Sequence, residues 1–198
     1  MNERRAMLAA ALALLVPACP AAAKEVSGVV LPESARPEGS AAELRLRGGG
    51  VFRFFFLRYY VCGLYVADGP GGASAILASD APRRIYLVTL RRISSFEFLW
   101  GLDQGLADNL SPAEAEALRE PLAQVRATIR AIGAIARGAR VAIDYVPGAG
   151  TSIVVDELRR GERFAGKALN DALMRVWIGE RPLDASLKEA LLGGGRKG

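Results

Sequence analysis

The sequence contains no histidine, and this absence excludes several kinds of active site. A Ser-His-Asp or Cys-His catalytic group and a metal site with histidine ligands cannot be built from this chain. Its two cysteines, Cys19 and Cys62, are too few for a cysteine-only zinc site. We therefore expect no metal and no cofactor, and any acid–base chemistry would use tyrosine, lysine, arginine or carboxylate groups.

A strong excess of one charge is also lacking. The 26 basic and 21 acidic residues give a net charge of +5, and they are spread along the chain without a basic run. Because nucleic-acid-binding proteins usually cluster their basic residues on one surface, we expect no nucleic-acid partner.

Long apolar runs are missing except at the N-terminus. Arg4 and Arg5 precede the apolar residues 7–16, a run too short to cross a bilayer, and Ala21–Ala23 offer small side chains for cleavage. Residues 1–23 are therefore predicted to be a secretory signal peptide. The mature protein would then be periplasmic and would have no transmembrane segment.

Two alternatives to a cleaved signal peptide stay open. The same residues could form a buried N-terminal helix. Val16–Cys19 also resembles the cleavage box of lipoproteins, which would leave a lipid anchor on Cys19. If Cys19 is instead removed with the signal, Cys62 is the only thiol, and the mature chain has no internal disulfide. The apolar neighbours of Cys62 predict that it is buried.

The remainder of the chain predicts one α+β domain with an antiparallel sheet covered on one face. Residues 24–40 are expected to form a flexible lead-in with one short strand, residues 41–192 the domain, and residues 193–198 a disordered tail. Apolar patterning predicts strands over 43–47, 51–66, 84–90, 140–145, 151–157 and 162–164. Capping and turn residues predict helices over 73–78, 95–109, 112–132, 165–178 and 185–192. Pro121 is expected to kink or split the helix over 112–132.

The stretch LRLRGGGVFRFFFLRYYVCGLYV, residues 44–66, combines aromatic rings with arginines. Its Gly-Gly-Gly run indicates a turn or a close backbone approach. Residues 51–66 are too many for one straight strand and must bend, bulge or turn near residues 57–59. If the alternation of a strand is unbroken, Arg53 and Arg58 point to opposite faces of the sheet.

Four segments, GGGVFRFFFLRYYVCGLYV, PRRIYLVTLRRIS, IDYVPGAGT and ALMRVWIGERPLDASLKEALLG, occur in an order and spacing similar to those of the chalcone isomerase-like proteins, in particular the exported bacterial branch. The resemblance covers about Ala41 to Leu192. It implies an open-faced β-sandwich, in which a large antiparallel sheet carries helices on one face, with a cleft for a flat or long apolar ligand between them. Plant members cyclise chalcones to flavanones, whereas a second branch binds fatty acids without catalysis.

The resemblance also implies a role for one arginine. In the enzymes an arginine after a Gly-x-Gly turn meets the oxyanion of the ligand. Alignment on YVCGLY places Phe52 at that position, so Arg53 is one residue late. A shift of one residue along a strand reverses the face. A bulge within residues 51–59 could restore the register and turn Arg53 into the cleft; otherwise it is a solvated or sheet-edge arginine.

The other polar positions of the enzymes are largely lost. Tyr60 replaces a threonine and resembles the fatty-acid-binding branch, in which an arginine and a tyrosine hold a carboxylate; the alternative is a core tyrosine. The enzymes' tyrosine and asparagine on the first helix have no counterpart, and their threonine or serine on the penultimate helix falls at Val176, beside Trp177. Because each such group carries a factor of about 10² or more, their loss argues against chalcone isomerisation.

The sequence thus favours a non-catalytic protein that binds a fatty acid or another amphiphilic apolar ligand. The candidate binding residues are Arg53 and Tyr60 at the polar end, with Phe52, Phe54, Val176 and Trp177 along the apolar wall. One alternative is an intramolecular lyase of chalcone isomerase type, in which Arg53 would be catalytic. Another is a structural or partner-binding protein of the envelope, which would have an exposed apolar patch and no internal cavity.

Overall fold

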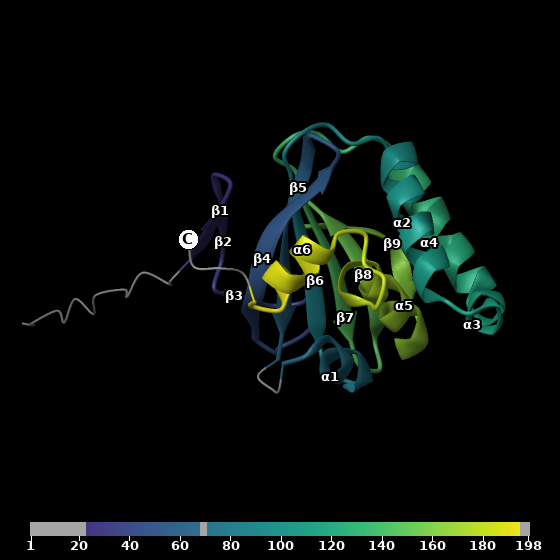
Figure 1. Cartoon of the computed structure of the whole chain (residues 1–198). Coiled ribbons are helices and arrows are strands. Elements are labelled where there is room, and N and C mark those ends of the chain that lie inside the picture. The colour runs from purple at the N-terminus through teal and green to yellow at the C-terminus, as the bar shows by residue number, and fades with distance from the viewer. Residues whose placement is uncertain (1–22, 68–70, 195–198) are drawn as a thin grey trace, which may run out of the picture.

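The structure, a computed structural model, describes residues 23–67 and 71–194. Its centre is a seven-stranded antiparallel sheet, in which spatial neighbours are also neighbours in the sequence, from β3 to β9 (Figure 1). The strands are β3 (Ser34–Ala35), β4 (Leu44–Phe54), β5 (Leu57–Val66), β6 (Arg83–Thr89), β7 (Arg140–Val146), β8 (Gly150–Val155) and β9 (Leu158–Phe164). The edge strand expected at 162–164 is longer than predicted, because β9 pairs along most of β8.

The helices pack on one face of this curled sheet (Figure 1). They are α1 (Ala73–Ala78), α2 (Ser95–Asn109), α3 (Pro112–Ala117), α4 (Arg119–Ile132), α5 (Lys167–Ile178) and α6 (Ala185–Leu191). Their apolar side chains and those of the facing strands form the main core. The predicted α+β class, a large antiparallel sheet with helices on one face, is confirmed.

The helix starts follow the local capping signals of the sequence. Ser94 and Ser111 each cap a helix, and each exchanges hydrogen bonds with a glutamate three residues later. The helix predicted over 112–132, with Pro121 kinking or splitting it, is split into two helices, α3 and α4, that meet at Leu118. Pro121 accounts for the break, because it has no N–H for the carbonyl four residues earlier.

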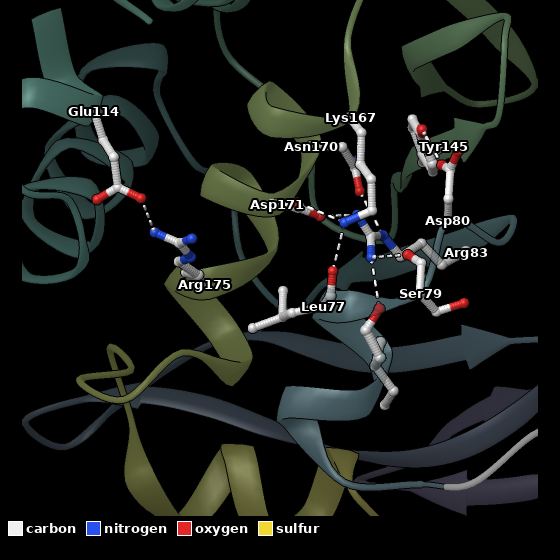
Figure 2. Close-up of polar contacts among 11 residues, drawn as sticks. Leu77, Ser79, Asp80, Arg83, Glu114, Tyr145, Lys167, Asn170, Asp171 and Arg175 are labelled. Atoms are coloured by element: carbon white, nitrogen blue, oxygen red, sulfur yellow. Dashed lines mark hydrogen bonds and ion pairs between the residues drawn. The ribbon is translucent and has the colours of Figure 1, made fainter. Parts of the chain in front are cut away.

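Glu114 at the start of α3 ties this helix to α5, and the contact predicts a pH effect. Arg175 Nη1 donates to Glu114 Oε1 at 2.8 Å (Figure 2). This bond, together with those from Ser111, lowers the pKa of Glu114 from 4.5 to about 2. A carboxylate whose pKa is depressed by folding stabilises the fold above its unfolded pKa, and that stabilisation is lost as the pH falls from about 4.5 toward 2.

We therefore expect Glu114→Gln to lower the urea midpoint of unfolding at pH 6 and to leave it unchanged near pH 2. Urea titrations between pH 2 and 6 would measure this narrowing difference. The exposed Glu43, for which the described residues offer no hydrogen-bond partner, provides the control Glu43→Gln, which should track the parent protein at every pH. A constant difference between the Glu114→Gln variant and the parent across the range would contradict the assignment.

The lead-in over residues 24–40 is more ordered than the composition suggests. Two strands, β1 (Lys24–Val26) and β2 (Val29–Leu31), form a hairpin, and β3 joins the main sheet. Leu31 is fully buried and packs in a small second core with Val51 and Val61, on the sheet face away from the helices. The sequence predicted one short strand here, whereas the structure has three, because Leu31 provides apolar area that composition averages out. Of the predicted signal peptide and tail, residues 1–22 and 195–198 lie outside the described residues.

The three consecutive glycines lie inside β4 rather than in a turn. A Cβ on Gly48 would overlap the backbone carbonyl of Ala190 in α6, and a Cβ on Gly49 would overlap the side chain of Leu31. The missing side chains let α6 approach one face of β4 while Leu31 covers the other. Of the two roles predicted for this run, close backbone approach is confirmed and the turn is wrong.

The long aromatic stretch is a hairpin. Phe54 at the end of β4 pairs with Leu57 at the start of β5, so that Phe55 and Phe56 form a two-residue turn. The reversal lies just before residues 57–59, where the sequence placed a bend. It divides the stretch into two strands that both carry aromatic side chains to the same end of the sheet.

Candidate functional site

A cavity of about 310 Å³ lies between the tip region of the β4–β5 hairpin and the helices α2 and α5. Aromatic side chains form most of its wall: Phe52, Phe54, Tyr59, Tyr60, Phe96, Phe98, Trp100 and Trp177. The remaining lining residues are Ile93, Glu97, Gly101, Leu102, Val176 and Leu183. Its volume is at the lower end of the range for small-molecule pockets, and its wall is as apolar as such pockets usually are.

A β-bulge in the β4–β5 ladder shapes the sheet side of this cavity. Phe52 pairs with Tyr60, whereas Arg53 pairs with Arg58, so Tyr59 on β5 has no partner on β4. Such an extra residue bends its strand and redirects the neighbouring side chains. Tyr59 and Tyr60 consequently both line the cavity, although they are adjacent in the sequence.

Arg53 does not reach the cavity. This bulge is on β5, so β4 keeps its alternation over residues 52–54: Phe52 and Phe54 line the cavity while Arg53, between them, is exposed and absent from the wall. Its cross-strand partner Arg58 is exposed as well. The other five candidate side chains from the sequence border the cavity: Phe52, Phe54, Tyr60, Val176 and Trp177.

The inner wall carries one buried polar pair. Trp177 Nε1 donates a hydrogen bond to Tyr60 Oη at 3.1 Å, and the ring of Phe52 stacks on that of Tyr60 at 5.0 Å between centroids. Burial, with a smaller effect of Cys62, raises the pKa of the Tyr60 phenol. The phenol therefore stays protonated and keeps a proton to donate, for which the described residues offer no acceptor. It can donate to a ligand oxygen, but it cannot act as a base at neutral pH.

The outer wall carries the one carboxylate among the lining residues, Glu97. Its Oε2 accepts from the backbone N–H and the hydroxyl of Ser94, at 2.9 Å each, and its Oε1 lies 3.3 Å from Arg91 Nη1. The backbone hydrogen bond from Ser94 is the main reason that the pKa of Glu97 is lowered. Arg91 also covers the ring of Tyr59, with 4.7 Å from Cζ to the centroid. Glu97 thus belongs to the capping box of α2, and Arg91 neutralises its charge, so it is not a free acid.

Sequence reasoning missed the contribution of α2. Phe96 and Trp100 are four residues apart and therefore share one helix face, which borders the cavity. This spacing is visible in the sequence as FEFLW. Tyr59 was missed for a different reason, because a bulge on β5 cannot be read from the alternation pattern.

A second polar cluster lies about two turns away along α5 and is structural (Figure 2). Arg83 Nε donates to Asn170 Oδ1 at 2.7 Å, and Arg83 Nη1 donates to the carbonyl of Ile76 at 2.7 Å. Its Nη2 contacts Asp171, which also accepts from Lys167 Nζ at 2.7 Å. The guanidinium is 2 % exposed and lies among partners from α1 and α5, so it joins these helices to β6.

Two further features bear on the kind of site. Across residues 23–67 and 71–194, no group of three or more acidic or cysteine side chains is placed to hold a metal ion. No helix in the same described ranges has the length and hydrophobicity needed to cross a bilayer.

Known proteins share this architecture. A family model described as chalcone isomerase-like matches residues 23–193. Among solved structures, a fatty-acid-binding protein of Arabidopsis thaliana is similar with a TM-score of 0.61 and 18% sequence identity, over 83% of this chain and 92% of that chain. At that identity the likeness concerns the fold. The comparison with curated protein sequences finds no match.

Proposed function

Because this chain belongs to the chalcone isomerase-like family, we propose that it binds a fatty acid or another amphiphilic apolar ligand in the cavity between the sheet and the helices. The observation that carries the proposal is the aromatic cavity itself, with Tyr60 and Trp177 as its buried polar pair. The similarity to a fatty-acid-binding protein of the same fold supports it.

The chemistry of the wall indicates how such a ligand lies. No arginine or lysine is among the lining residues, and an unpaired carboxylate is costly to bury. The apolar part of the ligand therefore enters, and Tyr60 donates to at most one uncharged oxygen. A charged head group stays at the mouth, where Arg91 has 38% of its side chain exposed. This differs from the carboxylate clamp of Arg53 and Tyr60 considered from the sequence.

Gly101 offers a way to close the cavity without disturbing the fold. It lines the cavity on α2, and a Cβ added to it would meet only Leu183 Cδ1, at 3.8 Å. We expect Gly101→Leu to fill the space and weaken binding of a fluorescent fatty acid at least tenfold in a titration. The matched variant Gly101→Ala adds one methyl group and should bind within about threefold of the parent protein.

Native mass spectrometry of the protein purified from cells gives an independent test. The parent protein should show the added mass of a bound lipid, and the Gly101→Leu variant should not. If fatty acids bind neither protein and no such mass co-purifies, the proposal fails. Equal binding by the Gly101→Leu variant and the parent would place the ligand elsewhere.

The isomerase alternative finds less support in this geometry. The wall lacks an arginine to meet a developing oxyanion, and the Tyr60 phenol is held neutral. Cyclisation of a chalcone above the buffer rate, and its loss in Tyr60→Phe, would establish it nevertheless. The partner-binding alternative assumed no internal cavity, whereas the structure combines a cavity with an exposed apolar surface.

Export to the periplasm is part of the same proposal and rests on the sequence of residues 1–23. The mass of the mature N-terminus would test it. If the signal peptide is cleaved, we expect the mass of a chain whose first residue is Lys24. If the protein is lipid-anchored, we expect a chain whose first residue is a lipid-modified Cys19.

A further inference from the structure

Exposed hydrophobic side chains gather around the mouth of the cavity. Eight large hydrophobic residues are exposed in the described part of the chain, and six of them belong to the hairpin tip or to α2. We call these six the aromatic rim: Phe54, Phe55, Phe56, Leu57, Phe96 and Trp100. The ring of Phe54 contacts those of Phe55, at 4.7 Å, and Trp100, at 5.1 Å, so the hairpin tip and α2 form one continuous surface.

The residues at the tip of the hairpin are unfavourable for a surface that stays exposed to water. Phe55 is 84% exposed and Phe56 is 90% exposed, so both rings lie in water. Phe55 also has a φ of 53°, a left-handed conformation that glycine or asparagine adopts far more readily. A bulky aromatic residue at this position is unfavourable both for the backbone conformation of the turn and for the solubility of the protein. Contiguous exposed apolar surface of this kind marks a site that another apolar phase covers.

The surroundings of the rim are basic. Arg53 and Arg58 lie directly opposite each other on β4 and β5, an arrangement that is unfavourable without an anion nearby. Arg91 and Arg92 follow β6 beside them, and the Leu90 N–H donates to the Tyr59 carbonyl at 2.8 Å.

The acidic groups near the rim are already engaged. Glu97, the nearest acid, is bonded to Ser94 and Arg91. Glu157 lies in the β8–β9 turn, at the same end of the sheet but several strands away, and is 3.9 Å from Arg140. Arginines therefore flank the rim, with Arg53 and Arg58 on the hairpin face away from the cavity and Arg91 over the Tyr59 ring on the cavity side.

We propose that the aromatic rim docks on the surface of an anionic lipid bilayer. Phe55 and Phe56 enter the boundary between head groups and acyl chains, and Arg53 and Arg58 bind lipid phosphates. Charge complementarity selects this occupant over a second copy of the chain, because a second copy would bring a like-charged set of arginines to the same face. In the docked state the mouth of the cavity opens at the membrane. The docking does not require that the cavity be occupied.

Sedimentation with vesicles tests the proposal, using the protein as cells produce it, with its N-terminus identified by mass. Vesicles of phosphatidylglycerol should bind the protein at least tenfold more strongly than vesicles of phosphatidylcholine. The double variant Phe55→Asn, Phe56→Ser should lose at least tenfold, since asparagine accepts the positive φ and keeps the turn. Val30→Ser, which changes a side chain that is 61% exposed on the β1–β2 hairpin, should bind as the parent does.

The arginines have their own matched pair. Arg53→Gln with Arg58→Gln should weaken binding to phosphatidylglycerol at least tenfold and flatten its salt dependence. Arg119→Gln with Arg181→Gln removes two exposed charges away from the rim and should reduce binding by less than threefold. Gly101→Leu should bind vesicles normally, so that failure of the ligand proposal and failure of the docking proposal are distinguishable.

Tryptophan fluorescence reports the geometry directly. Trp100 is 47% exposed on the rim, whereas Trp177 is 3% exposed. Brominated lipids should quench the parent protein, and Trp100→Phe should lose that quenching. The proposal is overturned if phosphatidylglycerol vesicles bind no protein or if the rim variants bind unchanged. It is also overturned if sedimentation velocity shows a dimer that the rim variants dissociate while vesicles bind neither form.

Discussion

Replacing Arg83 with methionine should lower the free energy of unfolding by about 3–5 kcal/mol, the range for removing one partner of a buried ionic network. The three nitrogens of this guanidinium reach Asn170, Asp171 and the carbonyl of Ile76. Methionine fills much of the volume but leaves these acceptors buried without a donor. Lys167 still neutralises Asp171 at 2.7 Å, which places the expected loss near the lower end of the range.

Lysine at position 83 would test whether charge or shape matters more. A lysine ammonium cannot reach three partners in three directions, so Arg83→Lys should recover less than half of the loss. Urea unfolding followed by circular dichroism measures both variants. Arg119→Met is the control, because Arg119 is 74% exposed and its loss should change the free energy by less than about 0.5 kcal/mol. Full stability of Arg83→Lys would show that charge alone supports the network.

Alanine at Gly48 should destabilise the protein by about 3 kcal/mol, the upper end for overpacking a dense contact. The added Cβ would overlap the carbonyl oxygen of Ala190 and lie 2.7 Å from that of Leu191. Both are backbone atoms of the last turn of α6, so relief requires the helix to shift rather than a side chain to rotate. For a chain of this size, such a loss corresponds to a fall in Tm of roughly 6–12 °C.

Gly101→Ala makes the same chemical change as Gly48→Ala, but we do not expect it to destabilise the protein. Its Cβ would have free space, and alanine is favoured over glycine inside a helix by about 1 kcal/mol, so this variant should be neutral or more stable. Calorimetry of both alanine variants gives the comparison. Hydrogen exchange should also show faster exchange in α6 for Gly48→Ala. Equal melting temperatures would mean that α6 does not press on β4 as described.

Local signals in the sequence predicted most of the elements. The serine–glutamate pairs starting at Ser94 and Ser111 and the aspartate cap at Asp184 place the starts of α2, α3 and α6. Such caps act within four residues, so no distant contact can override them easily. The strands predicted over 84–90 and 140–145 match β6 and β7 within one residue at each end, because a run of apolar and β-branched residues is also a local signal.

The predictions that were wrong depend on contacts between residues that are distant in the sequence. Leu31 and Gly49 contact each other across 18 positions, and neither the ordered lead-in nor the buried glycine run can be inferred from neighbours in the chain.

The candidate site divides in the same way. The sequence by itself determined the family, the sheet with helices on one face, and five of the side chains that border the cavity, because residue type and alternation are local properties. Only the tertiary structure decided where Arg53 points. The extra residue of the bulge is Tyr59 on β5, which leaves the alternation of β4 over residues 52–54 intact and turns the arginine to solvent. Which strand of a pair absorbs an extra residue depends on pairing across the sheet, and that pairing is set by the packing of the whole molecule.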